Sequence, residues 1–260
     1  MYNWIYNNIG INKLFNLPEW VLAIEVILCI VVPYMLGSIN TAIIISKKLY
    51  NDDIRRHGSG NAGMTNMQRT YGWKAALFTL LGDCAKQFVS ILFASFLLGI
   101  RGAYIAGMFC ILGHIAPVYY RFKGGKGVLT AATMILMLNP TVFLVVFALF
   151  ILVILVFRYV SLASVVAGFA YPGILYMYLK FTDTMNEAAM ICAFVMGLTI
   201  ILMHRSNLER LWNGKETKIR FSKKKEEPQR DYEQEEIDAT EYIDMTGKIL
   251  NNSGDENEKK

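Results

Sequence analysis

The sequence predicts an all-α, polytopic membrane protein: a bundle of about seven transmembrane helices followed by a disordered C-terminal tail. The first observation is composition, since 54% of the 260 residues are hydrophobic and 13% are aromatic. The second is distribution, because the apolar residues form runs of about twenty, the length of helix that crosses a bilayer core. The third is charge, which divides the chain into a basic part and an acidic end.

The charge pattern predicts three regions. Residues 1–220 carry 19 Lys and Arg against nine Asp and Glu, whereas residues 221–260 carry seven against twelve. We expect an interfacial, aromatic segment over residues 1–19, a membrane-embedded domain over 20–220 and an acidic, disordered cytoplasmic tail over 221–260. A basic membrane domain suits anionic headgroups and anionic substrates.

Seven apolar stretches are expected to cross the membrane. The first contains Pro33 and Gly37, so we expect a kink near its middle. The fourth has eleven residues, so we expect its glycine turn to extend it, or the stretch to be partly re-entrant. Before the seventh, Thr184 is the expected N-cap, with Glu187 three residues on as in a capping box. The stretches cover residues 20–50, 73–99, 103–120, 128–138, 141–157, 159–180 and 188–203.

Two ionisable residues interrupt the second apolar stretch. Asp83 and Lys86 are three residues apart and share a face of the predicted helix. Ionisable side chains inside a span usually face the bundle interior. Two interpretations stay open: a neutral pair that fixes helix packing, or a pair with a direct role in function.

The distribution of basic residues predicts the orientation. With seven spans and the N-terminus outside, the inner loops before the C-terminus are 47–74, 121–126 and the turn at Arg158. These loops hold ten Lys and Arg, whereas the outer side holds three. The positive-inside rule therefore places them in the cytoplasm. The polar, glycine-rich segments converge on that face, which is where we expect a site.

Two of these segments have the character of anion-binding loops. Residues 58–69, GSGNAGMTNMQR, match GxGxxG, but a dinucleotide fingerprint needs a preceding strand, and here apolar helices flank the match. The turn FKGGKG at 122–127 lacks the Walker pattern. Both segments still combine glycine amides with a cation, as phosphate cradles do. Arg69 adds a fork of donors suited to phosphate.

Metal and thiol chemistry find little support. The three histidines, His57, His114 and His204, have no partner at ligand spacing. The HxxxxD acyltransferase box and the DGxxAR signature of metal-dependent phosphotransferases are absent. The four cysteines lie unpaired in apolar runs and are expected to be buried small residues. We expect no metal and no cofactor, and one candidate base, His204, which shares a helix face with Asn207.

Six blocks, in this order, resemble the bacterial acyl-phosphate:glycerol-3-phosphate acyltransferases of the PlsY type. The resemblance covers about residues 25–218. The blocks are GSIN at 37–40, DIRRHGSGNAGMTNMQRTYG at 53–72, GDCAK at 82–86, GHIAPVYYRFKGGKGVLTA at 113–131, RYVSLAS at 158–164 and HRSNLERLWNGKE at 204–216.

The resemblance implies seven helices in a bacterial plasma (inner) membrane, with the active site facing the cytoplasm. It implies transfer of a fatty acyl group from acyl phosphate to the sn-1 hydroxyl of glycerol 3-phosphate, giving lysophosphatidic acid and phosphate, the first step of phospholipid synthesis. The expected partners are these substrates and membrane lipids, with no nucleic acid. No acyl-enzyme is implied, so the protein positions the reactants and stabilises charge.

The predicted site combines cradle chemistry with positions carried over from the resemblance. The two glycine-rich segments contribute expected substrate contacts at Gly58, Gly60, Asn61, Thr65, Asn66, Gly124 and Gly125. The resemblance adds Ser164 and Glu216 to the substrate contacts, and assigns the catalytic set Ser59, Arg69, Lys126, His204 and Asn207.

Two departures from the family pattern stand near the site. Met64 replaces the usual Ala and is bulkier, and Gln87 follows Lys86 where Gly is usual. Two other functions stay open. One is a transporter of a phosphorylated solute, although transporters usually contain two related halves and residues 20–130 show no repeat in 131–205. The other is a paralogue that binds acyl phosphate without turning it over.

Overall fold

The computed structural model describes residues 18–219. The chain divides into two units, Met1–Ile219 and Arg220–Lys260, and only the first contains described residues. The predicted acidic tail, and all but the last two residues of the predicted interfacial segment, therefore lie outside the described residues. Within residues 18–219 every regular element is a helix, which confirms the all-α prediction.

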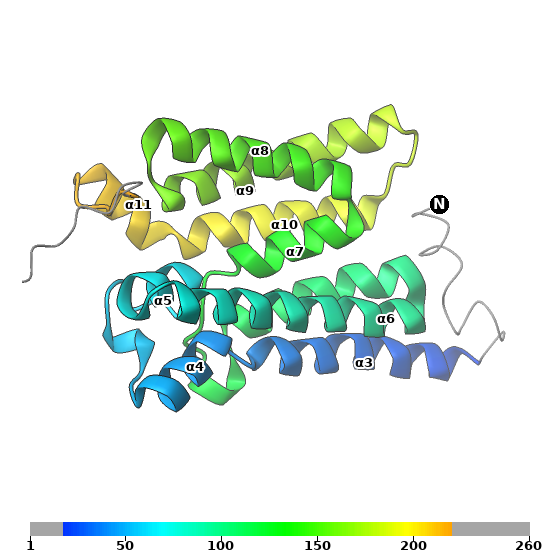
Figure 1. The fold of residues 1–260 in the computed structure, drawn as a ribbon. Helices are drawn as coiled ribbons and strands as arrows, with labels where there is room; N and C mark the ends of the chain where they lie inside the picture. Colours follow the sequence, from blue (N-terminus) through cyan, green and yellow to red (C-terminus); the bar gives the residue numbers. More distant parts are fainter. Residues whose placement is uncertain (1–17, 220–260) are drawn as a thin grey trace, which may run out of the picture. The chain divides into compact units, whose positions relative to one another are not determined.

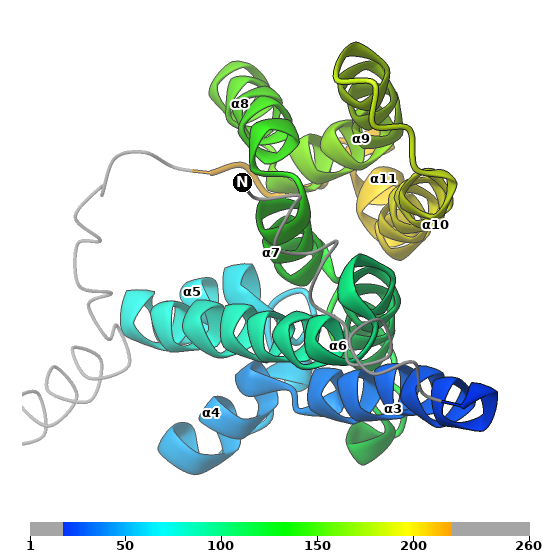
Figure 2. The same cartoon turned by 90° about the vertical axis from the view of Figure 1, so that its right-hand side faces the viewer.

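The long helices α3, α6, α8, α9 and α10 run along the length of the bundle in Figure 1, and Figure 2 shows the same helices after a turn of 90°. Short helical turns η1 (Ile54–Arg56) and η2 (Val118–Tyr120) lie in two connections. The α-helices are α3 (Glu19–Ser38), α4 (Thr41–Tyr50), α5 (Met64–Tyr71), α6 (Trp73–Ile115), α7 (Val128–Leu138), α8 (Pro140–Phe157), α9 (Val160–Phe181), α10 (Glu187–Met203) and α11 (Arg205–Trp212).

Helix α6 reverses direction at Gly99, whose φ of 60° and ψ of −140° are not helical. The side chains of Lys86 and His114 are 2.9 Å apart, although 28 residues of straight helix would separate them by about 42 Å. Gln87 Nε2 likewise donates to the Gly107 carbonyl at 3.1 Å. The predicted second and third stretches are therefore two antiparallel segments joined at one glycine (Figure 1).

Small residues let α3 approach the second segment of α6. A Cβ on Gly37 would collide with the Cys110 carbonyl, and one on Gly113 with the Tyr34 carbonyl. Close approach through small residues is how helices pack when lipid surrounds them. This contact fixes α3 against the end of α6 that leads into the 121–127 turn.

The first predicted stretch is broken, but the break lies a few residues after Pro33 and Gly37. Pro33 lies inside α3, and the break falls at Ile39 and Asn40, between α3 and α4. Asn40 causes the restart, because its Oδ1 accepts from the Ile43 amide at 3.1 Å and caps α4.

The predicted cap of the seventh stretch is wrong. Asn186, not Thr184, precedes α10, and its side chain accepts from the Ala189 amide at 3.1 Å. An Asn one residue before the helix outcompetes a Thr that is too far from the first free amides.

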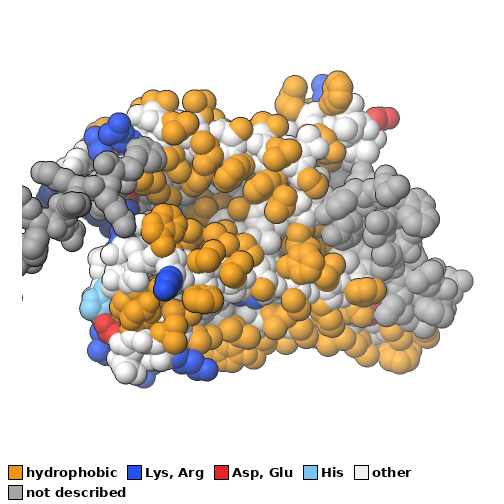
Figure 3. All heavy atoms as spheres, viewed as in Figure 1, with side chains coloured by type: hydrophobic (Ala, Val, Ile, Leu, Met, Phe, Trp, Pro, Cys, Tyr) orange, Lys and Arg blue, Asp and Glu red, His pale blue; other side chains and the backbone are white. Residues whose placement is uncertain are grey.

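Apolar side chains cover the flanks of the bundle (Figure 3). Within residues 18–219, four helical segments are long and apolar enough to cross a membrane: Trp20–Tyr50, Trp73–Tyr120, Pro140–Phe157 and Val160–Phe181. The bent pair of α10 and α11 is a fifth candidate, and α7 is shorter. The protein is a membrane protein; the count of seven spans stays a prediction.

The largest apolar cluster of the described residues is built by α6 to α10. Its fully buried members include Met134, Leu175 and Met196. A smaller cluster, which contains Ile43, Ile54 and Met67, lies beneath the loop between α4 and α5. Figure 3 shows Lys and Arg side chains gathered at the end of the bundle where α4, α5 and α11 lie. The polar loops meet at that end.

Candidate active site

The loop between α4 and α5 is shaped by one buried side chain, Asn66. Its Nδ2 donates to the carbonyls of Ile54 at 3.2 Å and His57 at 2.9 Å, and its Oδ1 accepts from the Ser59 amide at 3.0 Å. These three bonds use most of what an amide side chain offers. Asn66 therefore holds the loop in this conformation, and a direct contact with substrate stays a prediction.

The glycines of this loop are required by its backbone. Gly58 and Gly60 have φ of 56° and 71°, in the left-handed region that other residues rarely adopt. Gly58 also faces Asn66 Oδ1, which a Cβ would strike. The loop therefore presents Ser59 at the tip of a backbone that tolerates no side chain on either side.

The turn at 121–127 is packed against the same loop. The amides of Gly124 and Gly125 donate to the carbonyls of Ile115 and His114, at 3.1 and 3.0 Å. A Cβ on Gly125 would collide with His114 Nε2 and crowd the Ala62 carbonyl. In this conformation the two glycines serve close packing, and their amides are already engaged.

Arg55 joins the two loops. Its Nη1 donates to the carbonyls of Tyr120 at 3.1 Å and Lys123 at 3.4 Å, and its Nη2 pairs with Asp53 at 2.7 Å. Sequence reasoning did not single out Arg55. Arg55 lies in the matched block that begins DIRR, and that position could have marked it as a candidate. Only the structure shows which carbonyls its guanidinium reaches.

A second group of polar side chains surrounds Glu216, and we call it the Glu216 cluster: Lys126, Ser161, Asn207, Arg210 and Glu216. Glu216 Oε1 accepts from Ser161 and from Asn207, both at 2.8 Å, and Oε2 accepts from Arg210 at 2.9 Å. Lys126 Nζ donates to Asn207 Oδ1. The structure thus brings together residues from the 121–127 turn, α9, α11 and the segment that follows α11.

The charges of this cluster do not balance. Burial lowers the pKa of Lys126 to about 8, and the cations Arg210 and Arg69 lower it against the opposing effect of Glu216. Burial alone raises the pKa of Glu216, but hydrogen bonds from Asn207, Ser161 and Arg210 outweigh it and hold this pKa below its usual value. The cluster therefore holds two cations, Lys126 and Arg210, and one carboxylate, and Arg69 adds a third positive charge that acts on Lys126 from outside it. An excess of positive charge attracts anions.

Ser164 and His204 lie deeper at the same end of the bundle, and both are buried. Ser164 Oγ donates to the Val160 carbonyl at 2.9 Å. His204 Nδ1 lies 2.8 Å from the Ile200 carbonyl, which can only accept. Nδ1 therefore carries a proton, and Nε2 is the nitrogen that can accept one.

The other predicted residues lie on the surface beside these groups. Ser59 and Thr65 are exposed, Asn61 is half-buried, and Arg69 is an exposed residue in the last turn of α5. Arg69 is linked to Lys126 through its charge. Among residues 18–219 no hydrogen bond joins Ser59 or Thr65 to the Glu216 cluster. Ser161 and Arg210 were missed, although both lie inside the matched blocks.

Asp83 and Lys86 form a separate buried group with His114. Lys86 Nζ lies 2.8 Å from Asp83 Oδ1, 2.9 Å from His114 Nδ1 and 3.0 Å from the Ile39 carbonyl. Thr41 Oγ1 donates to the same Asp83 oxygen at 3.3 Å. This pattern favours the packing interpretation over a direct role in function.

The sequence is similar to a known family over most of the described residues. The family described as glycerol-3-phosphate acyltransferase matches residues 27–214. The glycerol-3-phosphate acyltransferase of Clostridioides difficile (strain 630) is 41% identical, over 74% of this chain and 95% of that protein. Glycerol-3-phosphate acyltransferase 2 of Bacillus anthracis is 40% identical, over 74% and 98%.

Two solved structures have a similar fold. Both are crystal structures of PlsY (YgiH), an integral membrane glycerol 3-phosphate acyltransferase. The glycerol 3-phosphate form has a TM-score of 0.68 and 35% identity, over 75% of this chain and 96% of that chain. The lysophosphatidic acid form has a TM-score of 0.66 and 34% identity, over 75% and 95%.

Proposed function

The chain belongs to the glycerol-3-phosphate acyltransferase family, and we propose that it moves a fatty acyl group from acyl phosphate to the sn-1 hydroxyl of glycerol 3-phosphate. The products are lysophosphatidic acid and inorganic phosphate. The observation that carries the proposal is the charge of the site, where Lys126 and Arg210 share one carboxylate, Glu216, and Arg69 adds a further positive charge that acts on Lys126. Both proposed substrates carry a phosphate, so a cationic site in a membrane protein suits both.

In the proposed reaction the sn-1 hydroxyl oxygen attacks the acyl carbon. A new ester C–O bond forms, and the bond from the acyl carbon to the phosphate oxygen breaks. The hydroxyl proton passes to a phosphate oxygen, so that phosphate leaves as hydrogen phosphate. No covalent enzyme intermediate is needed, because acyl phosphate is already activated.

We assign the protein's part to positioning and charge stabilisation. Lys126 and Arg69 bind phosphate oxygens, and Ser59 donates from the loop that Asn66 holds. Asn207 orients Lys126. His204 Nε2 accepts a hydrogen bond from a substrate hydroxyl, since Nδ1 is committed to the Ile200 carbonyl.

The site is proposed to face the cytoplasm. The excess of Lys and Arg in the loops at 47–74, 121–126 and 158 supports this orientation. Transport of a phosphorylated solute finds less support, because Asp83 and Lys86, which would line a path, are bonded to each other.

The test is a comparison of acyl donors. Purified protein is incubated with labelled glycerol 3-phosphate and either palmitoyl phosphate, palmitoyl-CoA or palmitoyl acyl carrier protein. Only palmitoyl phosphate should give lysophosphatidic acid, and the acyl group should be on the sn-1 oxygen. Equal use of a thioester, or binding of acyl phosphate without product, would contradict the proposal.

A further inference from the structure

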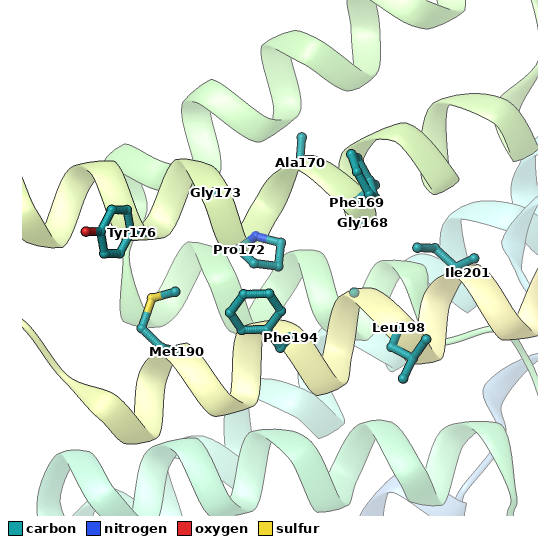
Figure 4. A pocket seen from close by; sticks show the side chains of 11 residues that line it. Gly168, Phe169, Ala170, Pro172, Gly173, Tyr176, Met190, Phe194, Leu198 and Ile201 are labelled. Atoms are coloured by element: carbon teal, nitrogen blue, oxygen red, sulfur yellow. The ribbon is translucent and has the colours of Figure 1, made fainter.

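An apolar groove lies between α9 and α10, and Figure 4 shows Pro172 and Phe194 facing each other across it. Tyr176 supplies the one side-chain hydroxyl of its lining, and none of the lining residues is charged. The groove therefore offers a phosphate group almost no side-chain donors. Placement of the proposed phosphate ligands must come from the polar loops at the basic end of the bundle, where Arg55 bonds from one glycine-rich loop to the other.

The guanidinium of Arg55 divides its donors between two tasks. Nε and Nη2 donate to the two carboxylate oxygens of Asp53, at 2.9 and 2.7 Å. Nη1 donates to the carbonyls of Tyr120 at 3.1 Å and Lys123 at 3.4 Å. The carboxylate thus neutralises Arg55 and holds its fork in the orientation that reaches the other loop. Because at most one N–H group remains, Arg55 is not arranged as a phosphate ligand.

The two carbonyls that Arg55 reaches enclose a strained piece of backbone. Between them lie Arg121 and Phe122, and both have a φ of 57°, in the left-handed region. Residues other than glycine seldom adopt this region, and such conformations persist only where neighbouring groups hold them. Bonds to the carbonyl before this pair and to the carbonyl after it are suited to hold the turn in this shape.

Each side of this contact carries a residue that we assigned to phosphate. Ser59 follows Arg55 by four residues in the loop between α4 and α5. Lys126 follows Lys123 by three residues, and the two amides between them are bonded to carbonyls in the last turn of α6. A shift of the 121–127 turn relative to the other loop would therefore change the separation of Ser59 and Lys126.

We propose that Arg55 is a positioning residue, whose bridge between the two loops fixes the spacing of Ser59 and Lys126 that acyl transfer requires. The proposal rests on the proposed function and deepens it, because it adds a residue that acts through the phosphate ligands without touching the substrate. The adjacent Arg56 is the matched control. Its side chain is exposed, and within residues 18–219 it makes no hydrogen bond to the 121–127 turn.

The first test replaces each arginine by lysine, which keeps the charge but not the fork. With palmitoyl phosphate and glycerol 3-phosphate, kcat for Arg55→Lys should fall about tenfold to a hundredfold, because a misplacement of about 1 Å has effects of that order. The loss should appear more in kcat than in KM, since the phosphate ligands remain and only their alignment changes. Arg56→Lys should change kcat less than about twofold. An unchanged kcat in Arg55→Lys would overturn the proposal, since charge alone would then suffice.

A double-variant cycle separates positioning from a contribution to stability. If Arg55 acts through the turn that carries Lys126, its loss should matter little once Lys126 is absent. Arg55→Ala/Lys126→Ala should therefore retain the activity of Lys126→Ala within about threefold. Losses that multiply in the double variant would make Arg55 an independent contributor, and the positioning role would be wrong.

Hydrogen–deuterium exchange in lipid nanodiscs tests the bridge without an acyl donor. Arg55→Ala should speed exchange in residues 53–63 and in 121–127 by at least about tenfold, because bonds from a charged group are lost, whereas Arg56→Ala should not. Faster exchange in residues 53–63 alone would remove the bridge, and faster exchange throughout α8 to α10 would assign Arg55 to overall stability; both results overturn the proposal. Absence of acyl transfer by the unaltered protein, with the bridge present, would contradict the proposed function instead.

Discussion

Two clusters in this protein combine a lysine with a carboxylate, one buried and one partly buried, and they differ in charge balance. Lys86 is paired with Asp83 and bonded to His114 and the Ile39 carbonyl, all inside the bundle. Lys126 donates to an amide, Asn207, and the nearby carboxylate of Glu216 is paired with Arg210 instead. The first cluster is complete, whereas the second keeps an excess of positive charge for a ligand.

The comparison shows why burial of a charge is not by itself a sign of function. A buried pair with all its bonds made fixes packing and binds nothing further. A partly buried lysine among other cations costs free energy in the unliganded protein, which a bound anion recovers. Only the second arrangement indicates a phosphate site.

The largest effect is expected at Lys126. Lys126→Ala removes a charge that the transition state needs, and kcat/KM for acyl transfer should fall about 10²–10³-fold, as when one stabilising donor is lost. Lys126→Arg keeps the charge and should retain part of the activity. The measurement is initial rate with palmitoyl phosphate, and thermal unfolding should be unchanged. Activity within tenfold of the unaltered protein would contradict the role of Lys126.

The opposite behaviour is expected at Lys86. Lys86→Met leaves the carboxylate of Asp83 buried without its partner and should destabilise the protein by about 3–5 kcal/mol. The double variant Asp83→Asn/Lys86→Met should recover much of this loss, because it removes both charges. Denaturant unfolding measures the free energies. A stable Lys86→Met protein that no longer binds glycerol 3-phosphate would place this cluster in the site instead.

A smaller effect is expected at Asn66, which holds the loop that carries Ser59. Asn66→Asp exchanges two donors for acceptors opposite the carbonyls of Ile54 and His57, so the loop should lose its shape. The KM for glycerol 3-phosphate should rise about tenfold while kcat changes less. Gln68→Glu makes the same chemical change on the surface of α5 and should have little effect. Equal KM values for the two variants would rule out the positioning role.

The smallest effect is the dependence on pH. The pKa of Lys126 is lowered to about 8, so the lysine is a cation below that pH and loses its charge above it. The kcat/KM for glycerol 3-phosphate, which reports the free enzyme, should fall by up to about tenfold per pH unit above pH 8. In Lys126→Arg this fall should move to higher pH. An identical profile in both proteins would assign the fall to another group.

The sequence predicted the helices and the end of the bundle where the loops meet, because apolar runs and basic residues report these directly. The predicted stretch 141–157 differs from α8 by one residue. The break between the stretches 73–99 and 103–120 was predicted from Gly99, Arg101 and Gly102, but these residues do not show that the backbone turns at Gly99 alone while helical structure continues on both sides.

The candidate site was predicted by residue type but not by contact. Ser161 and Arg210 donate hydrogen bonds to the Glu216 carboxylate. That these two side chains reach it depends on how α9 and α11 pack. Asn66 and the amides of Gly124 and Gly125 are used inside the loops, because neighbouring backbone groups needed partners. Such pairings arise from the tertiary structure and cannot be read from spacing.

The most direct test of the account is binding of glycerol 3-phosphate to three proteins in lipid nanodiscs, measured by calorimetry without an acyl donor. The account predicts that the double variant Asp83→Asn/Lys86→Met binds as tightly as the unaltered protein, whereas Lys126→Ala binds at least about tenfold more weakly. Unchanged binding in Lys126→Ala, or lost binding in a folded double variant, would contradict the assignment of the phosphate site to the Glu216 cluster.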